Sequence, residues 1–384
     1  MLPGGERLAE LPGQALATGR MLCEGTEVLT WDEIASRTEE RGIELFGGAG
    51  FDVHGVSVDA LAEDWREAID WTARTLLEPS FPETRLEWLR GRTLAELASW
   101  SERPDAAAEL ALLHQLYGEH PRAHLLEGTE NGLLELSPQA CRRFHRAALG
   151  RGLVIAVAGP IDRHRVAEHV RRALRLPRLE RPIDEDPVPL DRRPADRRSV
   201  TVRGEQGHLL LGALTVPRAH PDWPALELLG VALGDGPGLA GRLPARVRER
   251  DGLAYTVSVD TLEAAGVDPG RLVVRLSTTT ASLAPAESAV RDELSRLVET
   301  GVGEEELASG VAFLAASEAF GRETPAQWAR LLVEAELLGM PVDDVDWVVD
   351  GWRQLTPESV RDVCRRWLLP QDLQVVVGVP DRGI

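Results

Sequence analysis

The stretch LSPQACRRFHRAALGRGLVIAVAG, residues 136–159, decides the fold because its pattern occurs a second time in the chain. The second copy is LTPESVRDVCRRWLLPQDLQVVVGV, residues 355–379. Each copy opens with Ser or Thr followed by Pro, which is typical of a helix N-cap and the first helical position. Each continues as an arginine-rich helix and closes with an apolar run, which predicts strands over 153–159 and 373–379.

A second pair of segments repeats at nearly the same spacing. Residues 56–89 and 273–310 both read as a strand, an amphipathic helix, a short acidic turn and another helix. Their offset is about 217 residues, and that of the first pair is about 219. Two matches at one spacing predict tandem homologous halves.

The segment between the halves has the composition of a linker. The residues LPRLERPIDEDPVPLDRRPADRRSV, 176–200, are rich in proline and charge and show no periodicity. We therefore place the first half at 1–178, the linker at 179–197 and the second half at 198–384. Each half mixes period-two and period-3.6 segments, which predicts an α+β fold with a mainly antiparallel sheet and helices packed on it.

The halves differ at their beginnings. In the second half, two strand-like runs at 199–204 and 207–216 precede a helix at about 221–233. In the first half, the equivalent helix starts near residue 12, so the first sheet is predicted to lack its opening strands. Either a partner covers that edge of the sheet, or the sequence begins later than the first sheet does.

The composition excludes several classes of function. The net charge is −19, and all 43 basic residues are arginine. Such a surface argues against nucleic acid or an anionic membrane as the main partner, although basic peptides would be tolerated. The three cysteines, Cys23, Cys141 and Cys364, form no C-x-x-C motif and fit reduced thiols. Because no signal-like or membrane-length apolar segment is evident, we expect a cytoplasmic protein.

A longer segment carries a family resemblance. Residues 222–259, DWPALELLGVALGDGPGLAGRLPARVRERDGLAYTVSV, resemble the second half of the pitrilysin/insulinase-type metallopeptidases, or inverzincins. There, a glycine-rich loop precedes a helix that ends in Arg-Glu, and Gly-Leu-Ala/Gly-Tyr follows. The matching residues are Gly234, Gly236, Gly238, Arg248, Glu249, Gly252, Leu253 and Tyr255. QLYGEHPRAHLLEGT (115–129) and VIAVAGPID (154–162) resemble the family's Tyr-Gly-x-His-Pro segment and its closing strand. The resemblance implies a pitrilysin-like fold in both halves.

The zinc motif of that family is degenerate in this chain. Active members carry His-x-x-Glu-His on the first helix, where two histidines and a distant glutamate bind zinc and the motif glutamate activates water. Alignment of GQALATGRMLCEGT (13–26) places Leu16 and Arg20 at the ligand positions and Gly19 at the glutamate position. None of these side chains can do that chemistry. Glu96 stands where the distant glutamate would be, but its pattern alone favours a solvated helical glutamate.

Other histidines give no better metal site. His164 and His169 in HRVAEH are five residues apart, so they do not share a helix face. The pair in HPRAH (120–124) contains a proline and falls in a predicted loop. Isolated histidines are more often packed or solvated than metal ligands, which covers His54, His208 and His220. We therefore expect no metal or other cofactor in this chain.

Arg248 and Tyr255 are the candidate binding residues. Their pattern alone favours a helix-capping arginine beside a core tyrosine on a strand at 253–260. The family resemblance implies instead that the pair faces a zinc site on the other half or subunit and hydrogen-bonds the substrate backbone. The first half has Glu44 and Leu45 where the tyrosine would fall, so only the second half keeps the pair.

A retained clamp without a metal resembles the non-zinc subunit of heterodimeric bacterial members. The resemblance implies a homologous partner that carries His-x-x-Glu-His and zinc, and an extended peptide substrate such as a leader peptide. A non-enzymatic scaffold is the alternative, and it predicts that Arg248 and Tyr255 are buried in packing. A stand-alone zinc peptidase with an unrecognised site is the third hypothesis.

Overall fold

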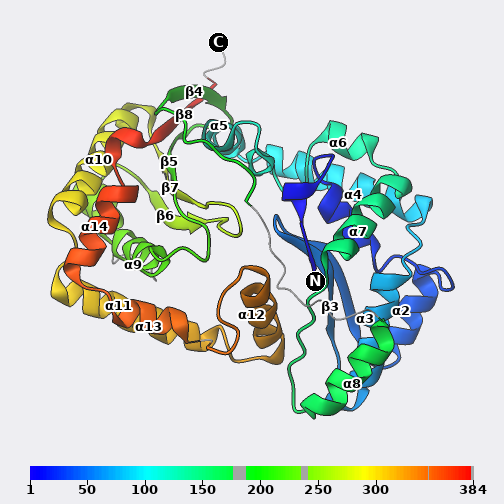
Figure 1. Ribbon diagram of the computed structural model, residues 1–384. Helices are drawn as coiled ribbons and strands as arrows, with labels where there is room; N and C mark the ends of the chain where they lie inside the picture. The colour runs from blue at the N-terminus through cyan, green and yellow to red at the C-terminus, as the bar shows by residue number, and fades with distance from the viewer. Residues whose placement is uncertain (176–186, 235–240, 345, 382–384) are drawn as a thin grey trace. The chain divides into compact units, whose positions relative to one another are not determined.

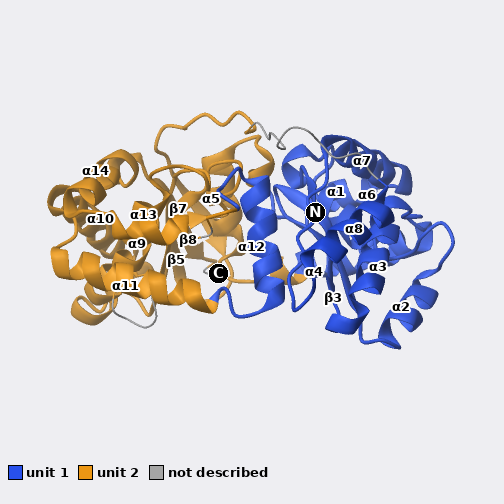
Figure 2. Cartoon of the chain, turned by 60° about the horizontal axis from the view of Figure 1, so that its bottom comes forward, with its two compact units in different colours: residues 1–98, 124–186, 321–342 blue, residues 99–123, 187–320, 343–384 orange. Residues whose placement is uncertain are grey.

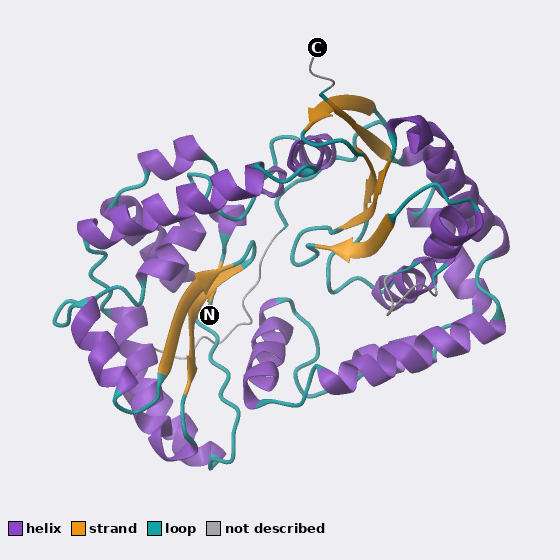
Figure 3. Ribbon diagram, turned by 180° about the vertical axis from the view of Figure 1, so that it is seen from behind, coloured by secondary structure: helices purple, strands orange, loops and turns teal. Residues whose placement is uncertain are grey.

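The computed structural model describes residues 1–175, 187–234, 241–344 and 346–381 (Figure 1). Contacts divide the chain into two compact units, which are described separately (Figure 2). Unit 1 comprises residues 1–98, 124–186 and 321–342, and unit 2 comprises residues 99–123, 187–320 and 343–384. Each unit has a sheet covered by helices, so the predicted α+β class is confirmed (Figure 3).

The sheet of unit 2 has five strands in the order β4-β8-β5-β7-β6. Only β4 and β8 pair in parallel, so the sheet is mainly antiparallel, as predicted. The strands are β4 (Arg197–Val202), β5 (Gly207–Leu214), β6 (Thr256–Glu263), β7 (Arg271–Thr278) and β8 (Gln374–Pro380). The predicted strands at 199–204, 207–216 and 373–379 are therefore present.

Helices cover both faces of this sheet because β5 is apolar on both sides. Leu209 and Leu211 belong to a buried cluster that includes residues of α9, α10 and α14, whereas Gly212 lies against Leu112 and Leu116 of α5. The helices of unit 2 are α5 (Ala106–Tyr117), α9 (Trp223–Leu233), α10 (Leu283–Thr300), α11 (Glu304–Phe320), α13 (Trp347–Arg353) and α14 (Pro357–Trp367). Short helical segments other than α-helices are η3 (Pro121–Ala123), η4 (Pro244–Arg250), η5 (Thr280–Ser282) and η6 (Pro370–Asp372).

The described part of unit 1 has a three-stranded antiparallel sheet in the order β1-β3-β2. Its strands are β1 (Leu2–Pro3), β2 (Glu44–Ala49) and β3 (Val53–Asp59). Its helices and turns are η1 (Glu6–Leu8), α1 (Gln14–Met21), α2 (Trp31–Glu39), η2 (Ala62–Asp64), α3 (Trp65–Leu77), α4 (Glu83–Ser101, which ends in unit 2), α6 (Glu130–Glu135), α7 (Pro138–Arg151), α8 (Arg163–Leu174) and α12 (Pro325–Leu337). None of the helices in the described residues has the length and hydropathy that a membrane span requires.

The repeat is visible in matching helices. Ser137 caps α7 by accepting from the N–H of Ala140, and Thr356 caps α14 by accepting from the N–H of Ser359. Each cap is followed by a proline in the first turn, as the sequence predicts. Helices α5 and α12 start at Ala106 and Pro325, 219 residues apart, which is the offset of the repeat. Each is grouped with the strands of the other half: α5 belongs to unit 2, and α12 belongs to unit 1.

The predicted strand at 153–159 is wrong, because these residues, all of them described, form no strand. Met1 and Val154 exchange two backbone hydrogen bonds there, at 2.8 and 3.0 Å. In unit 2 the corresponding strand β8 lies beside the eight-residue β5, whereas in unit 1 the place of β5 is held by β1, with two residues. A ladder that short does not define a strand.

Candidate functional site

The three degenerate motif positions lie on α1, which rests on the sheet of unit 1. The helix begins after Gly13, whose φ of +91° suits glycine, and the buried Glu6 carboxylate accepts from the N–H groups of Gly13 and Ala15. Burial raises the pKa of Glu6 to about 8, although its hydrogen bonds from these two N–H groups, which have no partner within the helix, act in the opposite direction. Leu16 is buried and offers no ligand atom.

Gly19 touches the sheet backbone to backbone. A Cβ atom at Gly19 would come within 3.0 Å of the carbonyl group of Gly48, and one at Gly47 would come within the same limit of the Gly19 carbonyl. Glycine is the residue that permits such an approach of two backbones. A glutamate at position 19 is therefore excluded unless α1 and β2 move apart.

Arg20 turns its charge toward Glu96. Its Nη1 donates to Glu96 Oε2 at 3.0 Å and to Thr93 Oγ1 at 3.2 Å, and Arg92 donates to the other carboxylate oxygen at 2.9 Å. Partial burial alone would raise the pKa of Glu96, but the hydrogen bonds from Arg20 and Arg92 bring it below its usual value. Glu96 is thus paired with two guanidinium groups rather than simply solvated, which corrects the interpretation that its pattern favoured.

These residues do not fit a zinc ion. Two of the three motif positions lack a ligand atom, and the third is a cation that already neutralises the remaining glutamate. Among the described residues, no group of three or more His, Cys, Asp or Glu side chains is arranged to hold a metal. His169 bonds Asp70 at 2.9 Å, and the buried His54 faces His145 at 3.3 Å.

The second candidate site is in unit 2, on a helix of uncommon geometry. Arg248 lies in the last turn of η4, which is a π-helix. The N–H of Asp251 bonds the carbonyl of Arg246 at 3.2 Å, and Gly252, with φ of +61°, then turns the chain toward β6. Short π-helical segments are rare and occur frequently at functional sites.

Arg248 and Tyr255 lie together and face solvent. The guanidinium carbon of Arg248 is 5.7 Å from the centre of the Tyr255 ring, within cation–π range. The Tyr255 N–H bonds the carbonyl of Ser277 on β7 at 3.3 Å, which fixes the backbone. The Tyr255 side chain is 74% exposed, whereas the only other tyrosine, Tyr117, is 2% exposed. The core tyrosine that the pattern favoured is therefore wrong, and the strand begins at Thr256 rather than at 253.

The pair offers hydrogen-bond donors of two kinds. A guanidinium and a phenol can hold a carbonyl or carboxylate oxygen between them. In the part of the chain that the structure describes, no carboxylate forms an ion pair with Arg248, although its neighbours Arg246 and Arg250 both pair with Asp251. Gly236 and Gly238 of the glycine-rich loop lie outside the described residues.

Two features of these sites were not predicted from the sequence. The contact between Gly19 and Gly48 had a signal, because glycines stand at positions 19, 47 and 48, but their meeting depends on the fold. The family resemblance placed Arg20 and Glu96, 76 positions apart, at ligand positions of one site, but the ion pair between them was not predicted, and Glu96 was expected to be solvated.

Comparison with known proteins finds a matching family model and several relatives that align with most of this chain. Residues 136–314 match the family model described as "Peptidase M16 inactive domain". An uncharacterized zinc protease of Streptomyces coelicolor is 27% identical over 369 residues, which are 93% of this chain and 79% of that protein. The "non-peptidase homolog YmxG" of Helicobacter pylori is 24% identical over 370 residues, which are 95% of this chain and 84% of that protein.

Solved structures share the whole architecture. The crystal structure of a peptidase M16 inactive domain from Pseudomonas fluorescens is similar with a TM-score of 0.84 and 25% identity, covering 98% of this chain and 90% of that one. The crystal structure of a protease from Helicobacter pylori has a TM-score of 0.86 at 16% identity, covering 99% and 92%. The second likeness concerns the fold alone.

Proposed function

We propose that this chain is a non-catalytic member of the peptidase M16, or pitrilysin/insulinase, family and serves as the substrate-binding subunit of a heterodimeric zinc peptidase. In this proposal a homologous partner carries His-x-x-Glu-His and the zinc ion, and the present chain contributes Arg248 and Tyr255. The substrate is a peptide bound in extended form, with leader peptides as one class. The cytoplasm is the proposed location.

The observation that carries the proposal is the exposure of the Arg248/Tyr255 pair. Burying a large aromatic ring stabilises a fold by about 1.5–3 kcal/mol, and Tyr255 forgoes most of that gain. The scaffold alternative predicts a buried pair, so this exposure favours a binding role. The zinc-motif positions of unit 1 support the non-catalytic part of the proposal, because Gly19 and Arg20 are engaged by the chain's own groups.

The chemistry of the pair suits the carbonyl group beside a scissile bond. A guanidinium supplies several N–H donors together with a positive charge, and the phenol supplies a directed O–H donor. Both would strengthen their hydrogen bonds as negative charge develops on the carbonyl oxygen. The net charge of −19 would further favour peptides of positive net charge.

The test mixes this chain with a homologue that carries the intact motif and measures cleavage of a fluorogenic peptide. Removing one donor by Tyr255→Phe is expected to lower kcat/KM about 100-fold, the usual effect of losing one oxyanion-stabilising donor. Arg203→Met is the matched control for Arg248→Met, since it removes another exposed arginine of the same unit. Because Tyr255 is exposed, the thermal unfolding midpoint of Tyr255→Phe should equal that of the wild type.

Unchanged turnover with Tyr255→Phe would refute the clamp. Cleavage by the isolated chain that stops on addition of a chelator would refute the division of labour between two subunits. Peptide cleavage that needs the partner but is insensitive to both Tyr255→Phe and Arg248→Met would favour the scaffold.

A further inference from the structure

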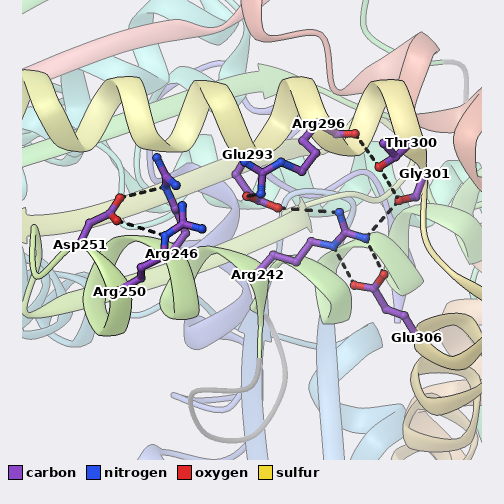
Figure 4. Close-up of polar contacts among 9 residues, drawn as sticks. All are labelled: Arg242, Arg246, Arg250, Asp251, Glu293, Arg296, Thr300, Gly301 and Glu306. Atoms are coloured by element: carbon purple, nitrogen blue, oxygen red, sulfur yellow. Dashed lines mark hydrogen bonds and ion pairs between the residues drawn. The ribbon is translucent and has the colours of Figure 1, made fainter.

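We infer that Arg242 is a positioning residue that fixes the segment presenting Arg248 and Tyr255; the functional part of this inference rests on the proposed function. Arg242 stands two residues before the first residue of η4, and its side chain points toward Glu293 of α10 and Glu306 of α11 (Figure 4). It would act through the helix that follows it and would not touch the substrate.

Arg242 makes the most extensive set of polar contacts near η4. Its Nε and Nη2 donate to the two carboxylate oxygens of Glu306 at 2.8 and 2.6 Å, a bidentate arrangement. Nη2 also donates to the carbonyl of Gly301 at 3.1 Å, and Nη1 lies 3.8 Å from the buried Glu293 (Figure 4). Because Gly301 follows α10 and Glu306 is in the first turn of α11, one guanidinium ties the start of η4 to the junction of two packed helices.

The residue just before Arg242 is equally constrained. A Cβ atom at Gly241 would come within 3.0 Å of the backbone of Gly234, the residue that ends α9. Leu243, just after Arg242, is fully buried. The backbone on both sides of Arg242 is thus held by packing, and the guanidinium fixes the direction in which the helix leaves.

The other end of η4 has its own anchor. Arg246 Nε lies 2.9 Å from Asp251 Oδ2, and Arg250 Nε donates to Asp251 Oδ1 at 3.2 Å (Figure 4). The N–H of Leu253 bonds the carbonyl of Val247 at 2.8 Å, which joins the turn to the helix. Between these two anchors, Arg248 is the arginine whose charge stays turned toward the Tyr255 ring.

This arrangement explains why a π-helix can persist here. A single π-helical turn is less favourable than an α-helical one, so contacts outside the helix have to maintain it. Shortening Arg242 would free the start of η4 to rewind, and rewinding would rotate Arg248 away from Tyr255. The predicted effect of Arg242 is therefore on the geometry of the pair rather than on its charge.

The chain contains two tyrosines, which gives a direct readout. Protein labelled with 3-fluorotyrosine should show two ¹⁹F resonances, and Tyr255→Phe identifies the exposed one. We expect Arg248→Met to shift the Tyr255 resonance, because a cation near an aromatic ring polarises it. We expect Arg242→Met to move the same resonance toward that position, while the resonance of the buried Tyr117 stays in place.

Arg291→Met is the matched control for Arg242→Met. Arg291 also bonds a glutamate and a backbone carbonyl, Glu287 and Pro370, and it lies on α10; among the described residues, its hydrogen bonds do not involve η4. Arg291→Met should leave the Tyr255 resonance unchanged. If Arg242→Met disturbs the fold, the Tyr117 resonance will also move. Arg242→Lys and Glu306→Gln are the second pair of variants: they weaken the same ion pair without removing a side chain, so they should shift the Tyr255 resonance alone.

A Tyr255 resonance that is identical in the wild type and in all three weakened-pair variants would overturn the inference. In the peptidase mixture, Arg242→Met alone should lower kcat/KM. Added to the Tyr255→Phe/Arg248→Met double variant, it should have little further effect. The spectroscopic arm uses neither substrate nor partner, so failure of the proposed function and failure of the positioning role give different results.

Discussion

Helix α1 of unit 1, which carries the degenerate motif positions, and η4 of unit 2, which carries Arg248, differ in the exposure of their candidate residues. On α1, the positions that the family uses for chemistry are occupied by the chain's own contacts: Gly19 against Gly48, and Arg20 with Glu96. On η4 and the turn after it, Arg248 and Tyr255 are well supported but turned outward. The candidate motif positions of unit 1 are thus filled from within the chain, whereas the pair that we propose as a clamp remains accessible to solvent.

The two sheets also differ, because the sheet of unit 2 is the more complete one. In unit 2, β5 is a full central strand with partners on both sides, and α5 packs on it. In unit 1, the place of β5 is held by the two residues of β1. The more complete sheet supports the half that we propose to bind substrate.

The largest expected effect concerns the closed contact in unit 1. Gly19→Ala should lower the free energy of unfolding by about 3 kcal/mol, because the new Cβ collides with backbone that cannot rotate away. Gly91→Ala on α4 is the control: its Cβ meets nothing within 4 Å, so it should stabilise by about 1 kcal/mol. Urea unfolding at neutral pH measures both.

Equal effects of these two substitutions would contradict the close contact between α1 and β2.

A stricter test of the closed contact restores the motif with Leu16→His/Gly19→Glu/Arg20→His. That variant should not gain thermal stability from added zinc, because position 19 has no room for its side chain. Zinc-dependent stabilisation would show that the site can reopen.

The next effect is the pH dependence that the buried His54 gives to the stability of unit 1. Burial and the neighbouring His145 lower the pKa of His54 in unit 1 to about 3. The folded state therefore excludes a proton that the unfolded state binds below its ordinary pKa, so stability present above about pH 6.5 is lost as the pH falls toward 3. Between about pH 7.5 and 5.5 the loss should be about 1.4 kcal/mol greater in the wild type than in His54→Asn.

Urea unfolding at the two pH values measures this difference, which cancels the contributions of groups that do not contact His54. His164→Asn, at an exposed position on α8, should behave as the wild type does. Identical pH dependence in the wild type and His54→Asn would mean that His54 is accessible to solvent protons, contrary to its buried place beside His145.

The smallest effect is the coupling of Arg20 to Glu96. A double-mutant cycle with Arg20→Met and Glu96→Gln should give about 0.5–1 kcal/mol, because both side chains are partly exposed and water screens the pair. The cycle with Arg92→Met should give less, about 0.3–0.5 kcal/mol, as for other exposed pairs one helical turn apart. A coupling near zero would leave Arg20 without a role in holding α1 to α4.

Local signals in the sequence predicted much of this molecule. The caps at Ser137 and Thr356, the strands of unit 2 and the placing of Arg248 in the last turn of a helix all follow from patterns a few residues long. The strand predicted at 153–159 was wrong because an apolar run becomes a strand only beside a partner, and β1 is too short to provide one. The contacts of Gly19 and Arg20 likewise depend on residues far away in the chain, which propensity and periodicity do not report.

The exchange of α5 and α12 has a consequence for synthesis on the ribosome. Residues 99–123 leave the exit tunnel before any strand of the sheet on which they pack, and residues 321–342 arrive long after the rest of their own unit. Neither unit can be completed from one contiguous stretch of nascent chain, so cutting the gene at the linker should yield two fragments that each lack an element of their final packing. Completion of each unit is therefore expected to be late, because unit 1 waits for residues 321–342 and unit 2 waits for β8.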